Sequence, residues 1–138
     1  MSHSHTVRVY YEDTDLAGIV YYANYLKFIE RARSEWVRDL GLDQVQMKAA
    51  GEGVFAVRRV LADYLAPARF DDLLEVTTDY LHHSGARLIL RQGVFRCSVK
   101  LFEAEVTLVC LSDSGRPQAL PDTLLKKIGE NPPYKRQL

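Results

Sequence analysis

A short acidic stretch near the start of the chain holds residue types that could do chemistry. Residues 12–15 read Glu-Asp-Thr-Asp, and Gly18 follows them just ahead of a periodic apolar stretch. A carboxylate aimed at a reacting carbonyl can act as nucleophile or general base, but the same group in a loop more often forms a turn or a cap. Taken alone, Asp15 fits a turn better than a reagent, and Asp13 fits a residue that hydrogen-bonds loop amides.

A metal site is a weaker interpretation of the same stretch. The three carboxylates within residues 12–15 offer oxygen ligands, but the glycine pattern of a calcium loop does not follow them. Asp71 and Asp72, adjacent in a turn after Pro67, are expected to be solvent-facing turn formers rather than a catalytic pair. We therefore expect no metal.

One long helix is predicted directly behind the acidic stretch. From about Tyr22 to Leu40, apolar residues recur at helical spacing with charged residues mostly on the other side, and Gly41 suits a C-terminal cap. A helix N-terminus carries free N–H groups and the positive end of a dipole, so it is a natural site for an oxyanion. If the helix begins near Tyr22, the loop from Asp13 to Gly18 leads directly to such a site.

The remaining elements are predicted to be mainly strands. A short strand is expected at residues 6–11, and the connection after Gly41 could hold a helical turn. Longer strands are expected at residues 54–65, 73–83, 87–99 and 103–112. The short links between these four strands favour an antiparallel meander, and residues 120–129 could form a terminal helix. The fold class is therefore α+β, with an antiparallel sheet of about five strands and one long helix.

Composition supports one domain and excludes several functions. The chain has 138 residues, which suffices for one core, so we expect a single domain over residues 1–138 with flexible ends at about 1–5 and 130–138. Eighteen acidic residues balance eighteen basic ones, so no global field favours nucleic acid. The sequence shows no secretory leader and no apolar run of transmembrane length, which favours a soluble, cytoplasmic protein. Cys97 and Cys110 are expected to be buried thiols of a reducing compartment.

Three motifs together resemble a known family. A D-x-D-x-x-G segment at residues 13–18, a Y-x-x-Y segment at 22–25 and an A-P-A-R-x-D-D segment at 66–72 agree in order and spacing with hotdog-fold acyl-CoA thioesterases of the Tol-Pal cluster type, relatives of 4-hydroxybenzoyl-CoA thioesterase. The resemblance covers about Val7 to Asp122. It implies a central helix wrapped by an antiparallel sheet, homodimers often paired into homotetramers, active sites at the dimer interface, and no cofactor beyond the CoA of the substrate.

The resemblance also implies roles for individual residues. Asp15 matches the catalytic carboxylate, which acts as nucleophile or general base, and the main-chain N–H of Tyr22 matches the donor that polarises the thioester. Tyr11 matches a tyrosine near the site, and Gly18 would allow close backbone approach. Many Tol-Pal members have histidine where this chain has Tyr22, so an imidazole role is lost here. A main-chain N–H role is unaffected by that change.

Contacts to the CoA phosphates call for cations and free amides. Arg58 and Arg59 are adjacent on a predicted strand and should point to opposite faces, so at most one is expected to meet a given ligand. Ser84, Gly85 and Arg87 lie at a predicted turn, where amides and a cation could meet the nucleotide or the pantetheine arm. An ordinary charged hairpin is the alternative for that turn.

The predicted function is hydrolysis of an acyl-CoA, or of an acyl-carrier-protein thioester, to a free acid and a thiol. A hotdog protein that binds acyl thioesters or partner proteins without turnover is the alternative. A hotdog dehydratase would need a histidine paired with an acidic residue, but His5, His82 and His83 fall at the chain start or at a hairpin end. His3 and His5 are expected to be solvated in a flexible terminus.

Overall fold

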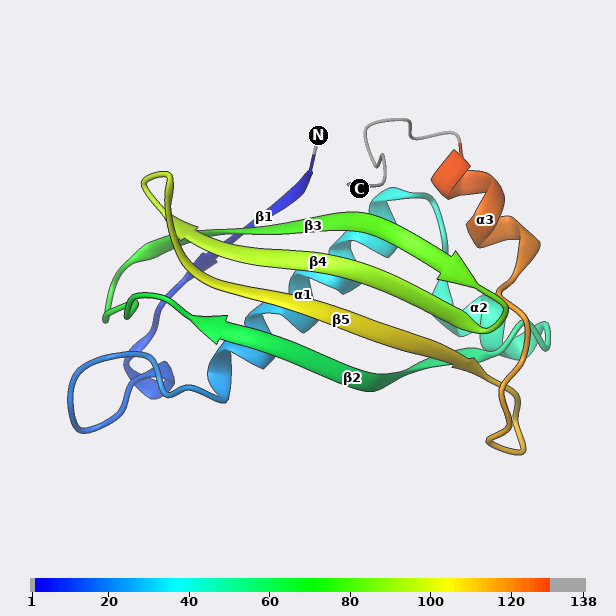
Figure 1. The fold of residues 1–138 in the computed structure, drawn as a ribbon, viewed down its shortest axis with the longest axis horizontal. Coiled ribbons are helices and arrows are strands. Elements are labelled where there is room, and N and C mark those ends of the chain that lie inside the picture. The colour runs from blue at the N-terminus through cyan, green and yellow to red at the C-terminus, as the bar shows by residue number, and fades with distance from the viewer. Residues whose placement is uncertain (1, 130–138) are drawn as a thin grey trace.

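One face of a five-stranded antiparallel sheet covers a single long helix in the computed structural model of the protein, which describes residues 2–129 (Figure 1). The strands are β1 (His3–Arg8), β2 (Val54–Tyr64), β3 (Leu73–Ser84), β4 (Arg87–Arg96) and β5 (Val99–Leu111). The helices are the 3-10 turn η1 (Tyr11–Asp13), α1 (Asn24–Asp39), α2 (Gln44–Ala49) and α3 (Asp122–Gly129). The predicted α+β class, with one long helix against five strands, is confirmed.

Helix α1 packs on the sheet through one apolar stripe. Its buried side chains recur every three or four residues: Tyr25, Phe28, Ile29, Ala32 and Trp36. The helix ends where Gly41 adopts a φ of 85°, which is strained for other residues. The N–H of Gly41 donates to the carbonyl of Arg38, and that of Leu42 donates to Val37, so the predicted glycine cap is confirmed. None of the helices in the described residues is long and apolar enough to cross a membrane.

The strand order corrects the predicted meander. The sheet runs β1-β3-β4-β5-β2, so only β3, β4 and β5 follow one another as neighbours. Strand β2 pairs with β5 instead of β3, and β3 pairs with β1. The link at residues 65–72 is longer than a hairpin loop of roughly two to five residues, so it can carry the chain across the end of the sheet. The meander of four strands was therefore wrong at β2.

The start of the chain is more ordered than expected. Strand β1 begins at His3, because residues 3–8 pair in register with β3. The Nε2 atom of His3 lies 2.7 Å from Oδ2 of Asp39, so this histidine contacts the end of α1 instead of solvent alone. The predicted flexible end at residues 130–138 lies outside the described residues.

The two cysteines differ in environment. Cys110 is buried, as predicted, and its burial raises the pKa of the thiol. Cys97 is exposed, so the prediction of a buried thiol was wrong there. It forms a turn with Ser98, where both residues have positive φ, and this turn splits the run predicted as one strand.

A buried polar contact fixes α1 on the sheet. Gln92 on β4 is fully buried, and its amide nitrogen donates to the carbonyl of Ile29 at 2.8 Å and to the hydroxyl of Thr78 at 2.9 Å. Its amide oxygen accepts a hydrogen bond from Arg33 on α1 at 3.0 Å. Burial lowers the pKa of the Arg33 guanidinium, so the loss of this acceptor would leave a poorly solvated cation.

Gln92→Leu should therefore destabilise the protein although it keeps an apolar core. The change leaves Arg33 and Thr78 without a partner, so we expect a loss of roughly 1–3 kcal/mol in the free energy of unfolding. Urea unfolding followed by circular dichroism measures it, and Gln46→Leu on the exposed side of α2 is the matched control. Equal stability of the two variants would contradict a bridging role for Gln92.

Candidate active site

The acidic loop (residues 12–20) contacts the link between β2 and β3 (residues 65–72). The N–H of Val20 donates to the carbonyl of Ala68 at 2.8 Å, and Ile19 forms an isolated bridge with Arg69. Thr14 bridges back to Val20, so the loop folds on itself like a short hairpin. The residues that directly follow the D-x-D-x-x-G segment are therefore in direct contact with the A-P-A-R-x-D-D segment, which is distant in sequence.

Asp13 holds the base of this loop. Its carboxylate accepts a hydrogen bond from the N–H of Tyr10 at 2.8 Å. Its main-chain carbonyl accepts from the N–H of Tyr21 and from the side-chain amide of Asn24, both at 2.9 Å. The prediction that Asp13 hydrogen-bonds loop amides is confirmed.

Asp15 has one carboxylate oxygen in a turn and the other available. Oδ1 accepts from the N–H of Ala17 at 2.9 Å, and the carbonyl of Asp15 accepts from Gly18, whose φ is 78°. Within residues 2–129, Oδ2 has no hydrogen-bond partner, and the residue is exposed. The turn thus orients the carboxylate while leaving an oxygen that could attack a carbonyl or take a proton from water. No group of three or more His, Cys, Asp or Glu side chains in the described chain could hold a metal ion.

The helix entrance, residues 21–24 at the N-terminal end of α1, lies next to this loop. Helix α1 begins at Asn24 rather than near Tyr22, because Tyr22 and Ala23 form a turn in which the N–H of Asn24 donates to the carbonyl of Tyr21 at 2.8 Å. The N–H groups of Tyr22 and Ala23 have no acceptor among the described residues. The predicted helix start was thus two residues early, but free N–H groups do occur at the predicted place.

The tyrosine rings near the site are largely exposed. The ring of Tyr22 lies 4.9 Å from that of Tyr21, and 62% of the residue is exposed. Tyr11 is 83% exposed and meets Phe70 edge-on at 6.1 Å. No contact joins Tyr11 to Asp15 in the described chain, so a role for Tyr11 stays a prediction.

Tyr25, the second tyrosine of the Y-x-x-Y segment, had no predicted role, yet it connects the helix to the link. Its ring stacks on Phe102 at 5.0 Å with an interplanar angle of 11°. Its hydroxyl accepts a hydrogen bond from the N–H of Ala68 at 3.0 Å, and burial raises its pKa. The Y-x-x-Y motif was the signal available in the sequence, but its second tyrosine could not be placed without the link.

Asp72 corrects another expectation. Its Oδ2 accepts from the N–H of Arg69 and from the guanidinium of Arg96, both at 2.8 Å, so it is not a solvent-facing turn former. Burial alone would raise its pKa, but these two donors outweigh burial and hold the pKa below the usual range. Asp71 is exposed, with a φ of 70°, as a turn residue would be. No motif marked Arg96, because its partner is set by how β4 and the link meet.

Strand β2 is irregular at Arg58, so the prediction that Arg58 and Arg59 point to opposite faces stays a prediction. Val57 pairs with Leu108 and Arg59 pairs with Thr107, so Arg58 is the extra residue of a β-bulge. The regular alternation assumed for the strand is therefore interrupted. Both arginines are exposed, and neither is brought to Asp15 by a contact in the described residues.

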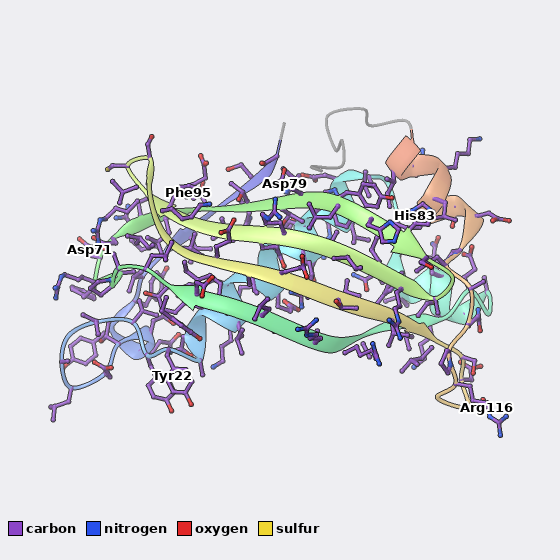
Figure 2. The ribbon with its side chains drawn as sticks, in the orientation of Figure 1. Tyr22, Asp71, Asp79, His83, Phe95 and Arg116 are labelled. Atoms are coloured by element: carbon purple, nitrogen blue, oxygen red, sulfur yellow. The ribbon has the colours of Figure 1, made fainter. Side chains whose placement is uncertain are left out.

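The turn with Ser84, Gly85 and Arg87 lies at the opposite end of the sheet from the acidic loop. Strand β3 has 12 residues, which extend roughly 35 Å, and it starts at the link and ends at Ser84. Figure 2 shows Tyr22 and Asp71 toward one end of the molecule and His83 toward the other. One chain does not bring this turn to Asp15, so its CoA-binding role stays a prediction.

Comparison with known proteins identifies the family. Residues 9–128 match the thioesterase-like superfamily. The chain belongs to this family. Within the thioesterase-like superfamily, it is 42% identical over 124 residues to the acyl-CoA thioester hydrolase YbgC of Escherichia coli O6:H1, with 88% of this chain and 92% of that protein covered. It is 41% identical over 120 residues to the acyl-CoA thioesterase YbgC of Haemophilus influenzae, with 86% and 88% covered.

Solved structures of thioesterases share the fold. A probable thioesterase from Bartonella henselae superposes with a TM-score of 0.82 at 35% identity, covering 88% of this chain and all of that one. A 4-hydroxybenzoyl-CoA thioesterase, solved as an Asp-to-Asn mutant with 4-hydroxybenzoyl-CoA, gives a TM-score of 0.86 at 21% identity, covering 91% and 97%. The predicted hotdog fold and thioesterase family are confirmed, whereas the Tol-Pal association stays a prediction.

The ion pair of Asp72 predicts a pH-dependent contribution to stability. Because the pKa of Asp72 is lowered in the folded protein, its contribution is complete above the ordinary carboxyl pKa of about 3.9 and is lost as pH falls through the lower folded value. Asp72→Asn should cost about 1 kcal/mol at pH 7, since the pair is partly solvated.

Thermal unfolding at a series of pH values from 7 to 2 tests this expectation. The difference between the wild type and Asp72→Asn should shrink below about pH 4, in line with the carboxyl pKa. Asp63→Asn, an exposed position on β2, is the matched control. A difference that stays constant down to the lowest pH would show that the Asp72 charge does not stabilise the fold.

Proposed function

We propose that the chain is an acyl-CoA thioesterase in which Asp15 is the reacting carboxylate and the main-chain N–H of Tyr22 binds the oxyanion. The observation that carries the proposal is the double hydrogen bond at the carbonyl of Asp13, which joins the acidic loop to the start of α1. It keeps the free oxygen of Asp15 and the free N–H groups at the helix entrance on one short, fixed segment. The acyl-CoA thioester hydrolases at about 42% identity support the reaction class.

The two groups have complementary tasks. As general base, Asp15 takes a proton from water while the water oxygen attacks the thioester carbon. As nucleophile, its oxygen attacks the same carbon directly, and water then hydrolyses the mixed anhydride. In both routes negative charge develops on the carbonyl oxygen, where a preoriented N–H stabilises it. The CoA thiolate leaves, takes up a proton, and the carboxylate of Asp15 is restored.

The substrate is an acyl-CoA or, as the second source of the same thioester, an acyl-carrier protein. Phosphate contacts from Arg58, Arg59, Ser84, Gly85 or Arg87 are part of the proposal. The turn with Ser84 to Arg87 is distant from Asp15 in one chain, so it could reach the CoA only from a neighbouring protomer. The proposal needs no cofactor beyond CoA, and a single domain in the cytoplasm suits a substrate of that compartment.

The proposal includes a homodimer built on the edge of β2. Among residues 2–129 this strand pairs only with β5 and its other edge is open, with Val57, Val60 and Leu61 exposed. A groove of about 530 Å³ runs between β2 and α1, lined by Leu26, Lys27, Ile29, Glu30, Arg31, Arg33, Val57 and Val60. Glu30 and Arg33 bring one charge of each sign to this groove, which suits a self-complementary contact with a second copy. Two such dimers could pair into the homotetramer that the resemblance implies.

Asp15→Asn tests the chemistry, because it keeps the shape and the turn but removes the anionic oxygen. We expect kcat on the best acyl-CoA to fall on the order of 10²-fold to 10⁴-fold, while CoA binding and the circular dichroism spectrum persist. Tyr22→Phe should be mild, since the donor is a main-chain N–H.

Asp113→Asn, in the turn at the far end of β5, is the matched control and should keep full turnover. Release of thiol across a panel of acyl-CoA and acyl-carrier-protein esters identifies the substrate. A folded Asp15→Asn protein with wild-type turnover would refute the mechanism. A wild type that binds these esters but hydrolyses none would favour the binding protein instead.

If the homodimer forms at β2, negative charge on the side of β2 that lines the groove should separate the protomers. Val57→Glu with Val60→Glu should shift the mass measured by light scattering to that of a monomer, and thioesterase activity should be lost with it, because carboxylates would be buried at the interface. Val45→Glu, an 80% exposed position on α2, should leave mass and activity unchanged. A wild type that is monomeric and active at micromolar concentration would contradict the proposed assembly.

A further inference from the structure

Tyr64, the last residue of β2, reaches the entrance of α1. Its hydroxyl donates a hydrogen bond to the main-chain carbonyl of Tyr22 at 3.0 Å. This contact joins residues 42 positions apart in the sequence, and it falls on the peptide between Tyr22 and Ala23, the N-cap residue of α1. No motif of the sequence marked Tyr64 as more than a strand residue.

The ring of Tyr64 is held by aromatic neighbours although the residue is 49% exposed. It meets Phe102 edge-on at 5.1 Å and Tyr25 at 5.5 Å, and both of these residues are buried. It also meets the ring of Tyr22 edge-on at 6.2 Å. Because the ring packs against buried aromatic residues, its hydroxyl is held in one place. The hydrogen bond to the helix entrance therefore costs little additional conformational entropy.

The two peptides at the entrance share a pattern. The N–H groups of Tyr22 and Ala23 are free in the described chain, and the carbonyl on each of their peptide units is occupied. The carbonyl of Tyr21 accepts from the N–H of Asn24, which fixes the peptide that carries the N–H of Tyr22. The carbonyl of Tyr22 accepts from Tyr64, which fixes the peptide that carries the N–H of Ala23. A bound carbonyl fixes its peptide plane and polarises the N–H on the other side.

We infer that Tyr64 is a positioning residue of the oxyanion site, which orients the peptide units at the entrance of α1 so that their N–H groups point at the thioester carbonyl. The inference rests on the proposed function, and it adds the N–H of Ala23 as a second donor beside that of Tyr22. Burial, with smaller contributions from Tyr22 and Tyr25, raises the pKa of Tyr64, so its hydroxyl keeps its proton at neutral pH.

Tyr64→Phe tests the inference, because it keeps the ring against its aromatic neighbours and removes only the donor. Loss of a complete oxyanion donor costs about 10²-fold to 10³-fold in kcat, so loss of its orientation should cost about 10-fold. KM should stay within about twofold, since the contact acts on the transition state rather than on ground-state binding. Tyr10→Phe, another exposed tyrosine at the same end of the molecule, is the matched control and should keep the wild-type kcat.

A spectroscopic measurement separates positioning from a general structural role. A ¹³C-carbonyl acyl-CoA bound to Asp15→Asn should show a carbonyl stretch shifted to lower frequency, because the N–H groups polarise the bond. Adding Tyr64→Phe should reverse part of that shift, while circular dichroism and CoA binding stay unchanged.

The outcomes distinguish this inference from the function on which it rests. An unchanged kcat and carbonyl frequency in Tyr64→Phe would overturn the role of Tyr64, and so would a rise in KM at constant kcat. If Asp15→Asn kept wild-type turnover, the proposed function itself would fail, whatever Tyr64→Phe showed. A 10-fold loss in kcat with the partial frequency reversal would establish Tyr64 as a positioning residue.

Discussion

The main-chain carbonyl of Asp13 is the point on which the candidate site depends. It accepts one hydrogen bond from the N–H of Tyr21 and one from the side chain of Asn24, the first residue of α1. Each such bond contributes only about 1 kcal/mol to stability, so their importance is geometric. They set the distance between the acidic loop and the helix entrance, which neither segment could fix alone. A carboxylate and a set of N–H donors become a site only when that distance is constant.

The same end of the molecule is held by contacts from three other parts of the chain. The link at residues 65–72 supports the loop through Ala68, whose own N–H is bound by Tyr25 on the helix. Asp72 and Arg96 fasten that link to the end of β4. The acidic loop is therefore supported by a link that is itself held by a helix and a strand, which suits a segment that must present reacting groups in fixed positions.

Much of the local structure followed from periodicity. The helical spacing placed α1 to within two residues at its start, and the alternating runs found β2 and β3 almost completely. The motifs placed Asp15 beside the helix entrance, and the observed contacts bring these segments together. Periodicity describes one segment at a time, so it could not tell which strand pairs with which. The short links between the strands suggested that β2 pairs with β3, which the sheet does not show.

The other features that the sequence did not predict have the same cause. The bulge at Arg58 depends on the register between β2 and β5, and the exposed turn at Cys97 depends on where β4 and β5 stop pairing. Asp72 looked like a turn residue because Arg96 is far away in sequence and meets it only in the folded sheet. The position of Arg87 at the opposite end from Asp15 likewise follows from strand direction, which composition and spacing do not reveal.

The pairing of β2 with β5 also governs the order in which the fold can be completed. Val54 pairs with Leu111, whereas Ser84 pairs with Arg87. The hairpin between β3 and β4 therefore joins residues close in sequence, whereas the pairing of β2 with β5 joins residues far apart. Contacts between distant residues close later than local ones, because a longer loop must be ordered first. During synthesis, β2 is made before β5, so it leaves the ribosome before the strand that covers it can pair with it. Its apolar side chains are therefore exposed in a nascent chain that already contains α1, and a cell must keep this segment from pairing with another chain until β5 arrives.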